Sequence, residues 1–277
     1  MSGSARERAD RAATVLVRIV IVLAVLFLLL PVVVGIAMSF DARSFLGPFP
    51  PKALSLRWYE RFFSDPVFMR GLRVSVLLAV AATLVSTVIG VAAAVGLDRG
   101  RFPGRDALVA LFLSPLIVPA VVIGFAMLLF YSWLGIGDGF LRLLGGHIVI
   151  TFPYTLRATL AGLAGIRPSL VEAAMSLGAT PRRAFFDVTL PLARTGIFAG
   201  AVLAFAFSFD EVAVSLFLAD PQSTPLPVAL VSMMRANFDL TVAAASTLLV
   251  GVTVVLILVL DRLVGIDRIV GQGVYRA

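Results

Sequence analysis

The sequence predicts an all-α integral membrane protein with six transmembrane helices and short cytoplasmic helices between the fourth and the fifth. Hydrophobic residues make up 60% of its 277 residues and charged residues only 14%, whereas a soluble domain is about 45–50% apolar and about 25% charged. Six apolar runs are each long enough to cross a bilayer core, which takes about 20 helical residues. The net charge of +7 comes almost entirely from arginine, which gathers in alternate loops.

The first apolar run, residues 19–38, follows an arginine-rich tail, residues 1–18. The run is too long for a cleaved signal peptide, and no Ala-x-Ala site closes it, so we expect it to remain as a membrane span. The loop of residues 41–71 comes next and carries charges of both signs. We expect this loop to fold into an extracytoplasmic cap, in which "SLRWYERFF" is typical of an amphipathic helix at the membrane interface.

The second, third and fourth runs are residues 72–97, 107–133 and 147–165. The fourth run is the weakest, because Pro153 and Arg157 interrupt it. Membrane helices tolerate proline where neighbouring groups satisfy the freed carbonyl. We therefore expect each of these runs to form one span.

The fifth and sixth runs are residues 195–219 and 240–260, and a tail, residues 261–277, follows. Positive residues favour the cytoplasmic side of a membrane protein. The arginines of both tails, of the loop after the second run and of the loop 166–194 share one side if both termini are cytoplasmic. The cap is the one basic loop on the other side. The prediction is a single membrane domain, residues 19–260, between two cytoplasmic tails.

The loop between the fourth and fifth runs is patterned as two short helices. Ser169 and Glu172 have the spacing of a capping box, in which each side chain satisfies a backbone N–H at the helix start. Gly178 is placed to end this helix in the left-handed conformation. Thr180 and Pro181 then suit the N-cap and first position of a second helix. The sequence thus predicts a rigid helix, a glycine joint and another helix.

Within this loop, "EAAMSLGA" followed by "LP" resembles the EAA signature of ABC importer permeases. The resemblance extends from the second run to the sixth. It implies that the loop forms coupling helices that dock on a cytoplasmic ATPase, with Glu172 offering a carboxylate to a partner arginine. The alternative is that the loop folds into two helical turns with no docking role, and that Glu172 only caps the first of them. The residues that carry the resemblance are Glu172, Ala173, Ala174, Gly178, Ala179, Leu190 and Pro191.

Two adjacent carboxylates, Asp210 and Glu211, interrupt the fifth run in "FAFSFDEVAVSLF". A charge near the bilayer centre costs roughly 2.5–3.5 kcal/mol on insertion scales, so such residues normally face a cavity or a partner. If the run is one helix, the two side chains point about 100° apart. Glu211 then shares a small, polar stripe with Ser208 and Ser215, and we expect this stripe to face a wet substrate path. The stripe also fits a helix-packing face.

Three roles for the carboxylates stay open: contact with a cationic substrate, an ion pair with an arginine of a partner subunit, or simple exposure at the outer interface. "FSFDEVAVSLFLADPQSTPLPVALVSMMR" and "LSPLIVPAVVIGFAMLL" resemble spermidine/putrescine-type permeases. This resemblance implies a polyamine substrate. Leu116 follows Ser114-Pro115 where some of those permeases have an acidic residue. Relatives that carry opines, phosphonates or amino-acid-like solutes remain alternatives.

Enzyme chemistry is not expected. The chain has no cysteine, no phosphate-binding G-x-x-x-x-G-K-[ST] loop and no metal-ligand cluster, and its single histidine, His147, is expected at the membrane edge. We therefore expect no catalytic residue, no metal and no cofactor on this chain. An ion-coupled secondary transporter is the alternative from another class.

The resemblance also implies partners and a location. These are a cytoplasmic ATPase dimer that uses ATP-Mg, a second permease subunit that forms a heterodimer with this one, and an extracytoplasmic solute-binding protein that delivers the small molecule. It places the chain among the lipids of the bacterial inner membrane, and a nucleic-acid partner is not expected.

Overall fold

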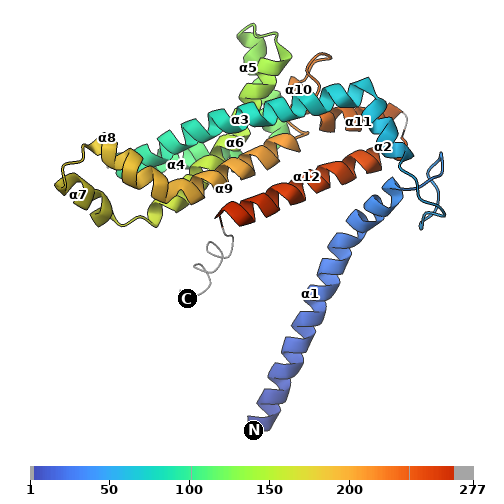
Figure 1. Ribbon diagram of the computed structural model, residues 1–277, viewed down its shortest axis with the longest axis horizontal. Coiled ribbons are helices and arrows are strands. Elements are labelled where there is room, and N and C mark those ends of the chain that lie inside the picture. Colours follow the sequence, from blue (N-terminus) through green and yellow to red (C-terminus); the bar gives the residue numbers. More distant parts are fainter. Residues whose placement is uncertain (1–2, 101, 237, 265–277) are drawn as a thin grey trace. The chain divides into compact units, whose positions relative to one another are not determined.

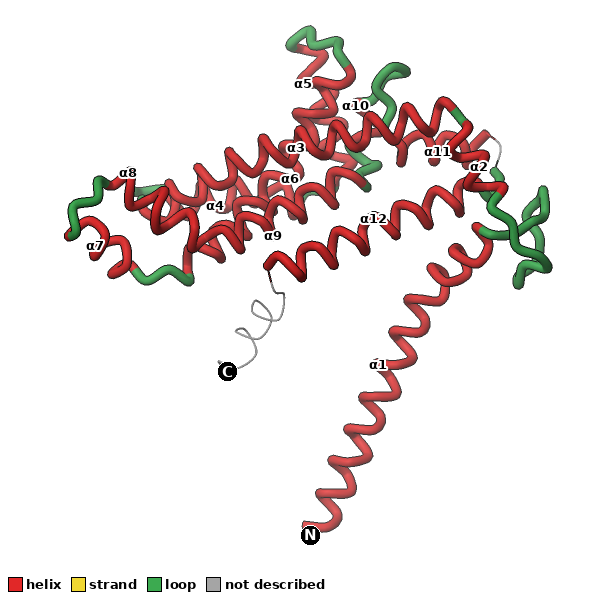
Figure 2. The backbone as a smooth tube through the Cα atoms, in the orientation of Figure 1, coloured by secondary structure: helices red, strands yellow, loops and turns green. Residues whose placement is uncertain are grey.

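The computed structural model describes residues 3–100, 102–236 and 238–264, and the regular structure of this part is helical apart from one isolated bridge between Asp41 and Leu54 (Figures 1 and 2). The all-α prediction is therefore confirmed. The chain divides into two compact units, one of residues 1–65 with 234–250 and one of residues 66–233 with 251–277. The predicted tail of residues 261–277 lies mostly outside the described residues.

The first unit contains α1 (Gly3–Ser39) and α2 (Arg57–Ser64). Residues 13–39 of α1 form an apolar span, and large side chains along it are exposed, as expected for a surface that faces lipid or a partner. The predicted amphipathic helix of the cap is present as α2. It buries Trp58, whose Nε1 donates a hydrogen bond of 2.7 Å to the carbonyl of Asp41. A small core gathers here from Met38, Trp58, Leu240 and Ala244.

Asp41 and Arg43 fix the start of the cap. The Asp41 side chain is buried, and Arg43 Nε donates to its two oxygens at 2.9 and 2.8 Å. These charge-assisted hydrogen bonds hold the pKa of Asp41 below its ordinary value. The loop is thus an ordered structure, as the sequence predicts.

The second unit is built on α3 (Pro66–Arg99), α6 (Gly139–Ala164) and α9 (Leu190–Phe209), which pack against one another (Figure 1). Small residues allow the close approach. A Cβ on Gly196 would lie 2.9 Å from the Cα of Gly162, and one on Gly200 would lie 2.9 Å from the Cα of Thr155. Such contacts between small residues are typical of membrane helices, which cannot rely on the hydrophobic effect to associate.

The third run is not one straight helix. It forms α4 (Arg105–Leu113), a 3₁₀ turn η1 (Ser114–Leu116) and α5 (Ala120–Trp133), and the two halves meet at 102°. Proline lacks an N–H and disfavours a helical conformation in the residue before it. Pro115 and Pro119 both lie at the bend, so the expectation of a single helix over 107–133 is corrected.

The fifth run also departs from expectation. The short helix α8 (Pro181–Ala184) continues through a π-helical turn η2 (Phe185–Thr189) into α9, which ends at Phe209. The predicted helix over 195–219 therefore stops ten residues early, and α10 (Ser215–Leu218) follows only after a break. We call residues 210–214 the acidic break.

The remaining helices are α7 (Pro168–Ser176), α11 (Leu226–Ala236) and α12 (Thr241–Val264). Within the described chain, three helices are long and apolar enough to cross a membrane, or up to five if each bent helix pair is counted as one span. The chain is thus a multi-pass membrane protein by length and composition, and the count of six stays a prediction.

Candidate functional site

The loop after α6 contains α7, which begins at Pro168. The predicted capping box is wrong, because the N-cap is Arg167 and no side chain caps the helix. Ser169 therefore lies within the first turn rather than before it. Glu172 is left exposed on the surface of α7, and so is Ala173.

Gly178 ends α7 as predicted. Its φ is +93°, in the left-handed region that favours glycine. The N–H of Gly178 donates to the carbonyl of Met175 at 2.9 Å, and that of Ala179 donates to Ala174 at 3.0 Å. This pair of bonds is the Schellman motif, which satisfies the last carbonyls of a helix. Ala174 and Ala179 are thus part of the joint itself.

The second helix starts as predicted, with Thr180 as its N-cap. The Thr180 side chain accepts a hydrogen bond of 3.3 Å from the Arg183 N–H, and Pro181 takes the first helical position. Leu190 and Pro191 then lie inside a continuous helix that runs from residue 181 to residue 209.

The π turn explains how Pro191 is accommodated. Proline within a helix loses its hydrogen bond to the carbonyl four residues back and clashes with that carbonyl. Here the wider turn lies directly before it, and the Leu190 N–H donates to Phe185, five residues back. Arg99 of α3 holds the same turn, donating to Thr189 Oγ1 at 2.9 Å and stacking 5.7 Å from the Phe185 ring. The turn that connects α8 to α9 is therefore also held by α3.

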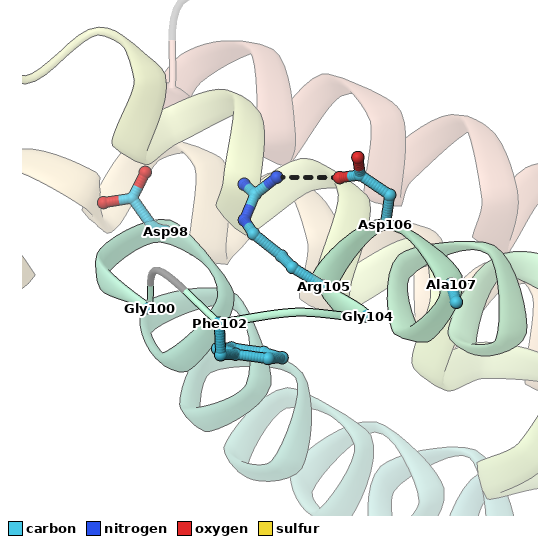
Figure 3. Close-up of a pocket in the computed structure, with 7 residues that line it drawn as sticks. All are labelled: Asp98, Gly100, Phe102, Gly104, Arg105, Asp106 and Ala107. Atoms are coloured by element: carbon cyan, nitrogen blue, oxygen red, sulfur yellow. Dashed lines mark hydrogen bonds and ion pairs between the residues drawn. The ribbon is translucent and has the colours of Figure 1, made fainter.

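Two hollows lie beside the C-terminal end of α3. One of about 330 Å³ lies between α7 and the ends of α3 and α6, with Glu172 and Arg99 in its wall. Figure 3 shows the other, of about 470 Å³, in the loop between α3 and α4. There Arg105 pairs with Asp106 at 3.2 Å and donates to the Leu97 carbonyl at 2.7 Å. Asp106 is 96% exposed, so this second hollow is an open surface feature.

The acidic break puts the two carboxylates in different positions. Asp210 is the C-cap of α9 and is exposed, and its N–H donates to Ala206 at 3.2 Å. Glu211 is half-buried, and its Oε1 accepts a hydrogen bond of 2.8 Å from the Val214 N–H. Since the helix has ended, the 100° rotation expected between the two side chains does not apply.

The electrostatic character of the break is negative. The C-terminus of a helix carries roughly half a negative charge, because its last carbonyls have no N–H partner. Here both carboxylates follow that terminus directly, so charge and dipole add. One helical turn before Asp210, Phe207 stacks on Tyr154 of α6, with ring centroids 4.1 Å apart. A carboxylate pair with aromatic faces suits an ammonium cation.

The two serines expected to face the substrate path are buried. Ser208 and Ser215 are 3% and 0% exposed. Their hydroxyls lie 2.8 and 2.9 Å from Nδ1 and Nε2 of His147, which is itself fully buried. The stripe therefore packs against α6 in this structure. His147 lies two turns inside α6, which begins at Gly139.

Sequence analysis missed Tyr154, Phe207 and Arg99 as parts of these sites. Phe207 lies three residues before Asp210, a spacing that places it one helical turn away. No local signal marks Tyr154 or Arg99, because each is brought in by a different helix.

Comparisons with known proteins agree with this architecture. The family model described as "Binding-protein-dependent transport system inner membrane component" matches residues 86–266. The putrescine transport system permease protein PotI of Escherichia coli strain K12 is 30% identical over 240 residues, covering 84% of this chain and 85% of that protein. The spermidine/putrescine transport system permease protein PotC of the same strain is 29% identical over 246 residues, covering 89% and 92%.

A solved structure shows the same fold. A chain in the crystal structure of a bacterial ABC transporter involved in the import of the acidic polysaccharide alginate superimposes with a TM-score of 0.70. It is 17% identical in sequence, and the match covers 94% of this chain and 98% of that chain.

Proposed function

We propose that this chain, which belongs to the family of binding-protein-dependent transport system inner membrane components, is the permease subunit through which an ABC importer moves a small cation of the polyamine class. Membership of the family makes it a transport subunit. The substrate class is supported by the relatives named for putrescine and spermidine, and by the acidic break.

The acidic break is the observation that carries the cation proposal. An apolar helix that stops at two carboxylates concentrates negative charge where the surroundings offer little water to screen it. Broken membrane helices bind cations at their C-terminal ends in other transporters. Asp210 and Glu211 supply the charge, and the stacked Tyr154 and Phe207 supply the aromatic faces.

Energy for transport would come from a separate ATPase dimer that uses ATP-Mg. The exposed surface of α7 is suited to dock on it, because Glu172 lies there and Leu177 at its end is 89% exposed. A second permease subunit would complete the path, and a solute-binding protein would deliver the cation from outside.

The membrane arrangement we propose has six spans and both termini in the cytoplasm of a bacterial cell. The spans are α1, α3, the bent pair α4 and α5, α6, the continuous helix from α8 through α9, and α12. The arginine distribution supports this orientation.

The test of the cation site is Glu211→Gln in the complete transporter. The glutamine oxygen can still accept from the Val214 N–H, so the turn is kept while the charge is lost. A hydrogen bond to a charged group contributes about 1.5–3 kcal/mol, and about 1.4 kcal/mol is a factor of ten. We expect the KM for putrescine uptake into vesicles to rise about tenfold.

Asp106→Asn is the matched control, because it removes one exposed negative charge from the first turn of α4. It should leave the KM for putrescine unchanged. Normal putrescine uptake by the Glu211→Gln and Asp210→Asn double variant would show that the carboxylates do not bind the cation.

A further inference from the structure

His147 joins the two ends of the acidic break. Its Nδ1 lies 2.8 Å from Ser208 Oγ and its Nε2 lies 2.9 Å from Ser215 Oγ. Ser208 stands just before the break and Ser215 just after it. One buried ring on α6 therefore fixes both sides of the five-residue break between α9 and α10.

The far side of the break is held by packing. Val214 is fully buried, and added Cβ atoms on Gly124 and Gly146 would each lie 3.0 Å from it. The Val214 N–H is also the donor to Glu211. The position of Glu211 is thus set through Val214 and Ser215, and the latter is bonded to His147.

A chain of buried hydroxyl groups links the backbone of His147 to α3. Thr151 Oγ1 donates to the His147 carbonyl at 2.6 Å and lies 2.7 Å from Ser86 Oγ of α3. Thr155 Oγ1 donates to the Ser86 carbonyl at 2.8 Å. The backbone of His147 on α6 is therefore linked to α3 through these hydroxyls, while its ring is bonded to Ser208 of α9 and Ser215 of α10.

We propose that His147 is a positioning residue that holds the acidic break in the shape that binds the transported cation. A neutral imidazole donates from one nitrogen and accepts at the other, and each serine hydroxyl can take the complementary part. Asparagine and glutamine each reproduce only one of these bonds. The binding consequence rests on the proposed function, whereas the shape of the break does not.

The absence of cysteine from the chain makes the shape directly measurable. Val212→Cys places a single thiol in the break of the assembled transporter in membranes. We expect His147→Asn to change the rate of labelling by a trimethylammonium methanethiosulfonate several-fold. Thr159→Val, an equally buried change on the same helix whose hydroxyl has no partner among the described residues, should leave the rate unchanged.

The Ser208→Ala and Ser215→Ala double variant is the second route, because it removes both bonds without altering the ring. It should change the labelling rate as His147→Asn does. An unchanged labelling rate in both the serine variant and His147→Asn would overturn the proposal whatever the substrate is.

Uptake separates the role of His147 from that of the carboxylates. His147→Asn should raise the KM for putrescine several-fold with little change in maximal rate, and it should have no such effect in a Glu211→Gln background. Equal KM effects in both backgrounds would overturn the claim that His147 acts through the break. If Glu211→Gln alone leaves uptake normal, the cation proposal fails, and the labelling result still decides the positioning claim.

Discussion

Asp210 and Glu211 are neighbours in the chain, but their side chains lie in different surroundings. Glu211 accepts a bond within the turn that follows it, while Asp210 is exposed at the end of α9. The sequence shows that two charges interrupt an apolar run. It does not show that the helix ends there, because no glycine or proline stands between residues 201 and 220. The break is held by groups from α5 and α6, which local patterns do not reveal.

Gly178 is the residue of the loop at which a single substitution should most clearly affect transport. Its φ of +93° is costly for alanine, by about 1–2 kcal/mol, although a Cβ would meet no neighbour within 4 Å. We expect Gly178→Ala to lower uptake and substrate-stimulated ATP hydrolysis while the protein still inserts into the membrane.

Gly165→Ala is the control for Gly178→Ala. Its φ is −80°, and the nearest atom to an added Cβ lies at 3.8 Å. It should leave transport close to normal. Equal activity of the two variants would show that the left-handed joint is not needed for coupling.

At the scale of the element, four prolines lie where helices begin or bend. Pro168 begins α7, Pro181 begins α8, and Pro115 and Pro119 lie at the bend between α4 and α5. The joint at Gly178 and the N-cap at Thr180 follow from the sequence because each depends on neighbouring residues alone. The capping box fails because Pro168 starts the helix earlier than its spacing requires.

Reversing one charge on α7 tests its docking role. Glu172 is exposed, so Glu172→Lys should insert and fold normally yet repel the cationic partner site that we propose. We expect loss of ATPase binding in detergent-purified complexes and loss of uptake. Asp106→Lys, an equal reversal at an exposed position on α4, should retain both.

Retention of ATPase binding by Glu172→Lys would place the docking contacts elsewhere on the chain. In that case the loop would still be a folded element, but Glu172 would have no part in the contact with the motor.

At the scale of the whole molecule, apolar length alone gives three spans, or up to five when each bent helix pair is joined. The proposed six-span arrangement requires the cap and α7 to lie on opposite sides of the membrane. Single cysteine substitutions can show on which side of the membrane each segment lies. Suitable positions are Leu54, which is 76% exposed in the cap, and Leu177 at the end of α7. Leu54→Cys should react with an impermeant thiol reagent in intact cells, and Leu177→Cys only in inverted vesicles that lack the ATPase.

Reaction of both cysteines from the same side would overturn the arrangement. The chain would then cross the membrane an even number of times between the two segments. The arginine distribution would have predicted the wrong side of the membrane for one of them.

The most direct test of the account is a crosslink between α7 and the ATPase in the assembled transporter. The Leu177→Cys thiol should form a crosslink to an ATPase subunit with a short bifunctional reagent, and Glu172→Lys should abolish it. A Leu177→Cys thiol that forms no crosslink and stays fully open to solvent labelling in an active complex would contradict the claim that this loop connects the permease to its motor.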